Sequence, residues 1–257
     1  RGRPAAQGLT VRFRVVIPAR YASTRLPGKP LLDIAGRPMI QRVVERACAS
    51  GASEVLVATD DARIAAVVSD MRGPHNAVAL LTDPSLASGT DRVAAVAVVQ
   101  GWADEDIVVN VQGDEPFLPA ELIDQAAAAL AADERTSIAT LATPIRSREE
   151  FADPNVVKVV VDRQNHALYF SRAPVPYARD PAPDADVFDG ALRHVGIYAY
   201  RVGALRRLVA LEPSPLERLE KLEQLRALQN GIAILVVHAS VVPPPGVSST
   251  TSSPPMA

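Results

Sequence analysis

The feature that most constrains the fold is a regular alternation of short apolar segments with amphipathic segments over residues 13–141. The apolar segments are continuous runs rather than alternating patterns, which indicates strands buried on both faces. Strands that alternate with helices predict an α/β fold, a mostly parallel sheet covered by helices on both faces. The predicted strands are residues 13–17, 55–58, 78–81, 107–111 and 137–141. The predicted helices begin near Pro38, Asp60, Thr90 and Ala120, and the first of them ends at Gly51.

The pattern changes after residue 141. Two short apolar runs, 156–161 and 167–170, flank the polar turn 162–165 and predict a hairpin. We therefore interpret residues 141–196 as an antiparallel excursion that serves as a lid or a dimerisation contact. A strand at 194–200, a leucine-rich helix at 216–230 and a last strand at 232–237 complete a single domain over 11–242, with disordered tails at 1–10 and 243–257.

Charge and composition exclude several classes of function. The net charge is −2 and no dense basic stripe is present, so a nucleic-acid surface is not expected. Cys48 is the one cysteine, which rules out an internal disulfide. No apolar run approaches the roughly 18 residues of a membrane span, and the first ten residues lack the apolar centre of a secretory signal. A soluble cytoplasmic protein is the expectation.

The loop after the first predicted strand, residues 18–30, carries three cations, Arg20, Arg25 and Lys29. Several donors close together suit a triphosphate, although the loop is not a P-loop. The alternative is a solvated basic loop. Of the 27 Lys and Arg residues, 24 are arginines, so a retained lysine at position 29 favours a functional ammonium group.

Asp114 directly follows the fourth predicted strand, where the loops of a parallel sheet form binding sites. A carboxylate there can hold Mg²⁺ against phosphate oxygens. The alternative is an ordinary turn aspartate. Near the start of the third predicted helix, Ser88 or Thr90 either caps the helix or receives a ligand oxygen.

Four polar residues further along the chain leave two interpretations open. Lys158 interrupts a run of valines and faces either solvent or a charged ligand. His194 lies in a strand and is either a structural histidine or a ligand for a carboxylate or hydroxyl group. Glu223 and Gln224 are most simply the solvent face of the leucine-rich helix.

Several segments together resemble one family, the 3-deoxy-manno-octulosonate (Kdo) cytidylyltransferases, also called CMP-Kdo synthetases. The resemblance runs from about Val15 to Val242 and is specific because the segments occur in the family's order. It implies a nucleotide-diphospho-sugar transferase-like fold, a homodimer, and a Mg²⁺-dependent reaction of CTP with Kdo that gives CMP-Kdo and pyrophosphate for lipopolysaccharide synthesis. The segments that carry it are residues 17–30, 58–60, 88–92, 110–116, 169–173, 193–198 and 222–226.

The resemblance also implies roles for individual residues. Lys29, Arg25 and Asp114 would be catalytic, and Asp114 would bind the metal. The residues expected beside the nucleotide are Ala19, Arg20, Arg25, Lys29, Ser88 and Arg92. The residues expected to line the sugar pocket are Gln112, Arg172, His194, Tyr198, Glu223 and Gln224.

One departure from the family pattern concerns the metal. After Gly246 and Val247 the family continues with an aspartate that supplies a second metal carboxylate, whereas Ser248 follows here. Mg²⁺ held by Asp114 alone would be bound more weakly, and turnover would be reduced. The missing carboxylate leaves one alternative open, a nucleotide-binding protein with weakened catalysis. A second alternative, independent of the metal, is a cytidylyltransferase for another acidic sugar, such as sialic acid.

Overall fold

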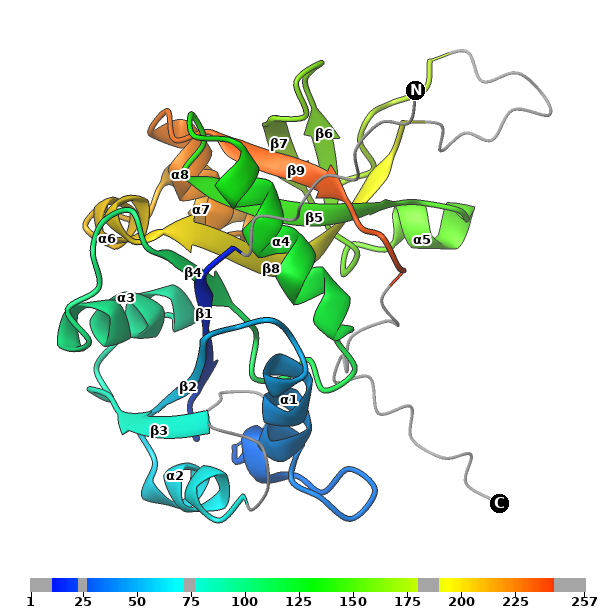
Figure 1. Ribbon diagram of the computed structural model, residues 1–257. Helices are drawn as coiled ribbons and strands as arrows, with labels where there is room; N and C mark the ends of the chain where they lie inside the picture. Colours follow the sequence, from blue (N-terminus) through cyan, green and yellow to red (C-terminus); the bar gives the residue numbers. More distant parts are fainter. Residues whose placement is uncertain (1–10, 23–26, 72–76, 180–189, 243–257) are drawn as a thin grey trace, which may run out of the picture.

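The structure, a computed structural model, describes residues 11–22, 27–71, 77–179 and 190–242. Within these residues, nine strands form one mixed sheet in the order β3-β2-β1-β4-β8-β5-β9, and the hairpin β6–β7 is attached through β8 (Figure 1). The predicted α/β class is confirmed. The predicted tails at 1–10 and 243–257 lie outside the described residues.

The first half of the chain forms the parallel part of the sheet. Strand β1 lies between β2 and β4 and pairs with both in parallel. All four carboxyl ends therefore meet at one edge, as the alternation of strands and helices predicted. The strands are β1 (Phe13–Ala19), β2 (Glu54–Thr59), β3 (Ala77–Leu81) and β4 (Ile107–Asn110).

Helices cover both faces of this sheet (Figure 1). On one face α1 (Met39–Cys48), α2 (Ala62–Ser69) and α4 (Ala120–Ala132) bury their apolar stripes. On the other face lie α3 (Gly89–Val99) and α6 (Val202–Val209). The described helices are all too short or too polar to cross a membrane.

The second half of the chain adds the antiparallel part. Strand β8 (Leu192–Arg201) runs antiparallel to both β4 and β5 (Ile138–Pro144), and β9 (Ile234–His238) pairs with β5 in parallel. The predicted hairpin is confirmed as β6 (Lys158–Val161) and β7 (Ala167–Ser171), preceded by the short helix α5 (Arg148–Ala152). The predicted antiparallel character is therefore confirmed, while its role as a lid or dimer contact stays a prediction.

Two helix boundaries differ from the sequence predictions. Helix α1 ends at Cys48 rather than at Gly51. Asp61, not Asp60, caps α2, because the Asp61 side chain accepts the Arg63 N–H. The Asp60 carboxylate is instead held by two other elements, as described below.

The predicted helix over 216–230 is wrong. The segment forms two helices, α7 (Pro215–Glu220) and α8 (Gln224–Gln229). They are separated at Lys221, which has left-handed backbone angles (φ 56°, ψ 44°). A residue in that conformation ends an α-helix, so the chain changes direction between Glu220 and Glu223.

Candidate active site

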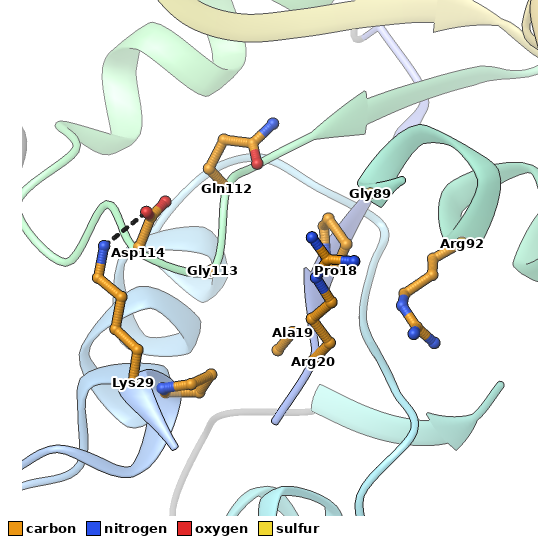
Figure 2. Close-up of a pocket in the computed structure, with 10 residues that line it drawn as sticks. Pro18, Ala19, Arg20, Lys29, Gly89, Arg92, Gln112, Gly113 and Asp114 are labelled. Atoms are coloured by element: carbon orange, nitrogen blue, oxygen red, sulfur yellow. Dashed lines mark hydrogen bonds and ion pairs between the residues drawn. The ribbon is translucent and has the colours of Figure 1, made fainter. Parts of the chain in front are cut away.

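A cavity of about 260 Å³ opens at the carboxyl edge of the parallel strands (Figure 2). Its walls come from the ends of β1 and β4 and from the start of α3, so it lies where the sheet topology predicts a site. Five predicted nucleotide or metal residues are brought together here, together with Gln112, which the resemblance places by the sugar. The lining residues are Pro18, Ala19, Arg20, Lys29, Pro30, Gly89, Arg92, Gln112, Gly113 and Asp114.

Two glycines allow the loops to form this cavity. A Cβ atom on Gly113 would lie 2.7 Å from the backbone oxygen of Pro18, so the loop after β4 can approach the end of β1 only with glycine at this position. Gly28 has a φ of 73° and immediately precedes the short 3₁₀ helix η1 (Lys29–Leu31). The left-handed turn at Gly28 therefore leads directly into Lys29 at the cavity wall.

Lys29 and Asp114 form an ion pair inside the cavity. The Lys29 Nζ atom lies 2.7 Å from Asp114 Oδ2 (Figure 2). The Asp114 side chain is 49% exposed and the Lys29 side chain 18%, so the carboxylate faces open space while the ammonium group lies deeper. One negative and one positive group side by side can hold a cation and an anion that belong to the same ligand.

The two arginines of the cavity have different surroundings. Arg20 is exposed, and its Nη1 donates to the carbonyl oxygen of Ala87. Arg92 is almost fully buried, and its guanidinium group bonds Asp60 Oδ2 at 2.8 Å and Thr82 Oγ1 at 2.6 Å. The charge of Arg92 is therefore largely neutralised by Asp60, whose other oxygen accepts the Tyr21 N–H. Arg20 is the arginine that can reach a ligand.

The start of α3 is tied to the α7–α8 turn. Ser88 caps α3 in a capping box with Asp91, which confirms the capping interpretation. The hydroxyl groups of Ser88 and Thr90 also donate to the two carboxylate oxygens of Glu223, at 2.9 and 2.8 Å. The prediction that Glu223 lies on a solvent face is therefore wrong. Burial raises the pKa of Glu223, and the two hydroxyl donors oppose this shift.

A second group of polar and aromatic side chains lies on β8. The ring of His194 lies 5.0 Å from that of Phe170 and 5.2 Å from that of Tyr198. Burial lowers the pKa of His194 to about 3, so the imidazole is neutral at pH 7 and shares a hydrogen bond with Thr140 Oγ1.

Asn110 lies directly opposite Tyr198 in the β4–β8 register. Within the described part of the chain, Asn110 Oδ1 and the Tyr198 hydroxyl are buried without a hydrogen-bond partner. Such groups are costly unless a ligand or water binds them. Asn110 was not among the ligand contacts predicted from the sequence, although an asparagine within the apolar run 107–111 was a usable signal.

The remaining predicted residues have different outcomes. Lys158 faces neither solvent nor a ligand: it is fully buried and donates to three backbone carbonyl oxygens, so both interpretations were wrong. Arg172 follows the end of β7, and its backbone and side chain are both hydrogen-bonded. Gln224 is half-buried at the first turn of α8. Arg25 and Ser248 lie outside the described residues.

Comparison with known proteins identifies the family. A model of the cytidylyltransferase family matches residues 14–234. A 3-deoxy-manno-octulosonate cytidylyltransferase of Thioalkalivibrio sulfidiphilus is 54% identical over 237 residues, which cover 91% of this chain and 93% of the relative. The enzyme of the same name from Methylococcus capsulatus is 54% identical over 241 residues and 92% of each chain. This chain belongs to the 3-deoxy-manno-octulosonate cytidylyltransferase family.

Solved structures agree with this assignment. The cytidylyltransferase is similar to a CMP:2-keto-3-deoxy-manno-octonic acid synthetase solved in complex with CTP, with 44% identity, a TM-score of 0.81 and 92% coverage of both chains. A cytidylyltransferase of Leptospira borgpetersenii shares the fold at 16% identity, with a TM-score of 0.53 over 89% of this chain and 76% of the other. The cytidylyltransferase is therefore a nucleotidyltransferase of the α/β class, as its sequence motifs indicated.

Proposed function

We propose that this enzyme activates Kdo with CTP and releases CMP-Kdo and pyrophosphate. The observation that carries the proposal is the cavity at the carboxyl edge of the sheet, where Lys29, Arg20 and Asp114 meet in a chain 54% identical to Kdo cytidylyltransferases. Kdo is a carboxylic acid and CTP a triphosphate, so the site must manage two anionic substrates. A cavity lined by Lys29 and Arg20 together with the exposed carboxylate of Asp114 suits this task.

In the proposed reaction, the anomeric hydroxyl group of Kdo attacks the α-phosphorus of CTP, and pyrophosphate leaves. Such a transfer depends mostly on positioning and on neutralising charge. Lys29 and Arg20 would bind the phosphate oxygens and stabilise the charge that develops on the leaving pyrophosphate. We extend this role to Arg25 from the sequence alone.

Asp114 would hold the magnesium ion. Within the described residues no group of three or more His, Cys, Asp or Glu side chains could form a metal site by itself. One carboxylate nevertheless fits Mg²⁺, which typically binds one or two protein carboxylates together with substrate phosphates and water. When bound, the ion would neutralise triphosphate charge, and Asp114 would set its position.

The sugar would bind on the β8 side of the cavity. Asn110 Oδ1 and the Tyr198 hydroxyl have no protein partner in the described part of the chain, and a polyhydroxylated sugar or its bound water can supply one. Neutral His194 can exchange hydrogen bonds with a hydroxyl group without adding charge. The other proposed contacts are Gln112, Arg172, Glu223 and Gln224, with the nucleotide lying nearer Ala19, Ser88 and Arg92.

Three wider features belong to the same proposal. The product would enter lipopolysaccharide synthesis. The enzyme would act in the cytoplasm, where CTP is available. A homodimer would form through the hairpin β6–β7 and the neighbouring residues of the segment 141–196. Sedimentation equilibrium tests the dimer, and a monomer at micromolar concentration would contradict it.

The deciding experiment measures pyrophosphate release from CTP, Mg²⁺ and Kdo, with sialic acid and no sugar as controls. We expect release that depends on Kdo and Mg²⁺. Pyrophosphate release with sialic acid but not with Kdo would indicate that the substrate is another acidic sugar. CTP binding without release would indicate a nucleotide-binding protein with weakened catalysis, and comparison with the Ser248→Asp variant at limiting Mg²⁺ would test whether the missing tail carboxylate is the cause.

A further inference from the structure

Lys158 is a buried ammonium group with an unusual set of partners. It lies at the start of β6 and is fully buried. Its Nζ atom donates to the backbone oxygens of Asp153 at 2.9 Å, Val156 at 2.5 Å and Arg172 at 2.7 Å. Lysine has three donors on one small group, and all three are used here on carbonyl oxygens. The ammonium group therefore joins the segment before β6 to the residue that follows β7.

Glu220, the last residue of α7, binds the same end of β7. One carboxylate oxygen accepts the hydroxyl groups of Ser171 at 2.7 Å and Tyr169 at 3.3 Å, and the other accepts the Arg172 N–H at 2.9 Å. Burial raises the pKa of Glu220, but the hydrogen bonds from Arg172, Ser171 and Tyr169 together lower it below its ordinary value. The carboxylate is therefore ionised at pH 7, and both of its oxygens accept hydrogen bonds.

These two residues fix Arg172 from both sides. Lys158 binds its carbonyl oxygen, and Glu220 binds its N–H. The Arg172 side chain is held as well, because Nε donates to the carbonyl oxygen of Glu220 at 2.8 Å and Nη1 donates to that of Pro154 at 2.9 Å. Among the described residues, Nη2 donates no hydrogen bond. The guanidinium group is thus held by the protein at Nε and Nη1, and its Nη2 donors are available to a ligand.

The turn after Glu220 continues to the nucleotide side of the cavity. Lys221 takes the left-handed conformation, and Glu223 then accepts the hydroxyl groups of Ser88 and Thr90. Gly89, between those two residues, lines the cavity. The turn between α7 and α8 is therefore bonded at Glu220 to Arg172 and at Glu223 to the cavity wall.

We infer that Lys158 and Glu220 are positioning residues that hold Arg172 in place for the carboxylate of the acidic sugar. This inference rests on the proposed function. A free arginine side chain loses rotamer freedom when it binds a carboxylate, and an arginine that is already fixed loses less. The pair would therefore tighten sugar binding without contacting the sugar and would leave CTP binding unchanged.

The test uses Glu220→Gln and Lys158→Met in the full chain, with substitutions of the exposed residues Glu212 and Arg207, Glu212→Gln and Arg207→Met, as controls. We expect KM for Kdo to rise about tenfold or more in both test variants, with KM for CTP changed less than about twofold. The controls should match the wild-type enzyme. Equal rises in both KM values, or no change in KM for Kdo, would overturn the inference.

A double-mutant cycle provides a readout that a purely structural role would not move. If Glu220 acts through Arg172, Glu220→Gln should add almost nothing to the loss caused by Arg172→Ala. Additive losses would overturn the inference. If Lys158→Met fails to fold, the cycle of Glu220→Gln with Arg172→Ala tests the inference by itself. The wild-type enzyme separates this inference from the proposed function, because a wild type without Kdo-dependent pyrophosphate release would refute the function itself.

Discussion

Replacing Gly113 by alanine tests whether the close contact between two loops sets the geometry of the active site. A Cβ atom at position 113 would lie 2.7 Å from the Pro18 backbone oxygen, whereas ordinary contacts begin at 3.4 Å. The loop after β4 would have to move away from β1 by roughly 0.7 Å to accept the methyl group. Because Asp114 is the next residue, its carboxylate would move relative to Ala19 and Lys29.

The expected losses follow from that displacement. Overpacking of this size costs about 1–3 kcal/mol of unfolding free energy, which lowers Tm by about 2–10 °C in a chain of this length. Misplacement of a reacting group by about 1 Å costs on the order of 100-fold in rate, so a shift of roughly 0.7 Å should lower kcat/KM at least about tenfold. The loss of activity should therefore exceed what unfolding explains at 25 °C.

Gly203→Ala is the matched control. Its Cβ atom would lie 3.0 Å from Asp104 Cβ, so it also overpacks, but it lies at the opposite edge of the sheet, near the start of β4. Pyrophosphate release and thermal unfolding would be measured on both variants. We expect Gly203→Ala to lose stability with kcat/KM nearly unchanged. A fully folded Gly113→Ala variant with wild-type kcat/KM would refute the reasoning.

Three further predictions concern single side chains. Asp114→Asn should lower kcat about 100-fold or more and raise the Mg²⁺ concentration needed for half-maximal rate, measured by pyrophosphate release; an unchanged Mg²⁺ dependence would contradict the metal role. The pKa of His194 is about 3 in the folded protein and near 6.5 in the unfolded chain. Its contribution to the unfolding free energy is therefore complete above pH 6.5, and it falls by at most about 1.4 kcal/mol per pH unit as the pH drops towards 3. His194→Gln should therefore flatten the fall of Tm between pH 6.5 and 4.5, and an equal slope in both proteins would show that His194 is not the titrating group. Arg92→Lys loses the fork that joins Asp60 to Thr82 and should lower the unfolding free energy by about 2–3 kcal/mol in urea titrations, whereas an unchanged midpoint would show that the buried pair contributes little.

The cavity edge could be predicted from sequence because it depends on chain direction alone. Buried strands that alternate with helices run parallel, and their carboxyl ends meet. The register pairs Val16 with Asn110, so the loops that carry Lys29 and Asp114 must emerge side by side. The edge itself follows without any long-range pairing, whereas the β1–β4 pairing that places these two loops next to each other came from the structure.

Lys158 shows where the same reasoning fails. A lysine within a run of valines is costly unless it is paired, and side-chain patterns direct the search towards a carboxylate or solvent. Its partners are three backbone carbonyl oxygens, which no residue type marks in a sequence. The strand could be predicted, but the environment of its charged residue depends on how the segment before β6 and the residue after β7 fold around it.

The spacing of the leucines in the segment 216–230 already argued against one continuous helix. Leu216, Leu219, Leu222, Leu225 and Leu228 recur every three residues, and each step of three falls about 60° short of a full turn at about 100° per residue. Over four steps the stripe drifts by roughly 240°, so a straight helix could not bury all five leucines. The structure places Leu225 in the core and leaves Leu219 79% exposed, with the break at Lys221 between them. That break directs Glu220 to β7 and Glu223 to Ser88, which lies 135 residues away in the chain. The leucine spacing therefore indicated, within one short segment, the turn that makes a long-range contact at the site.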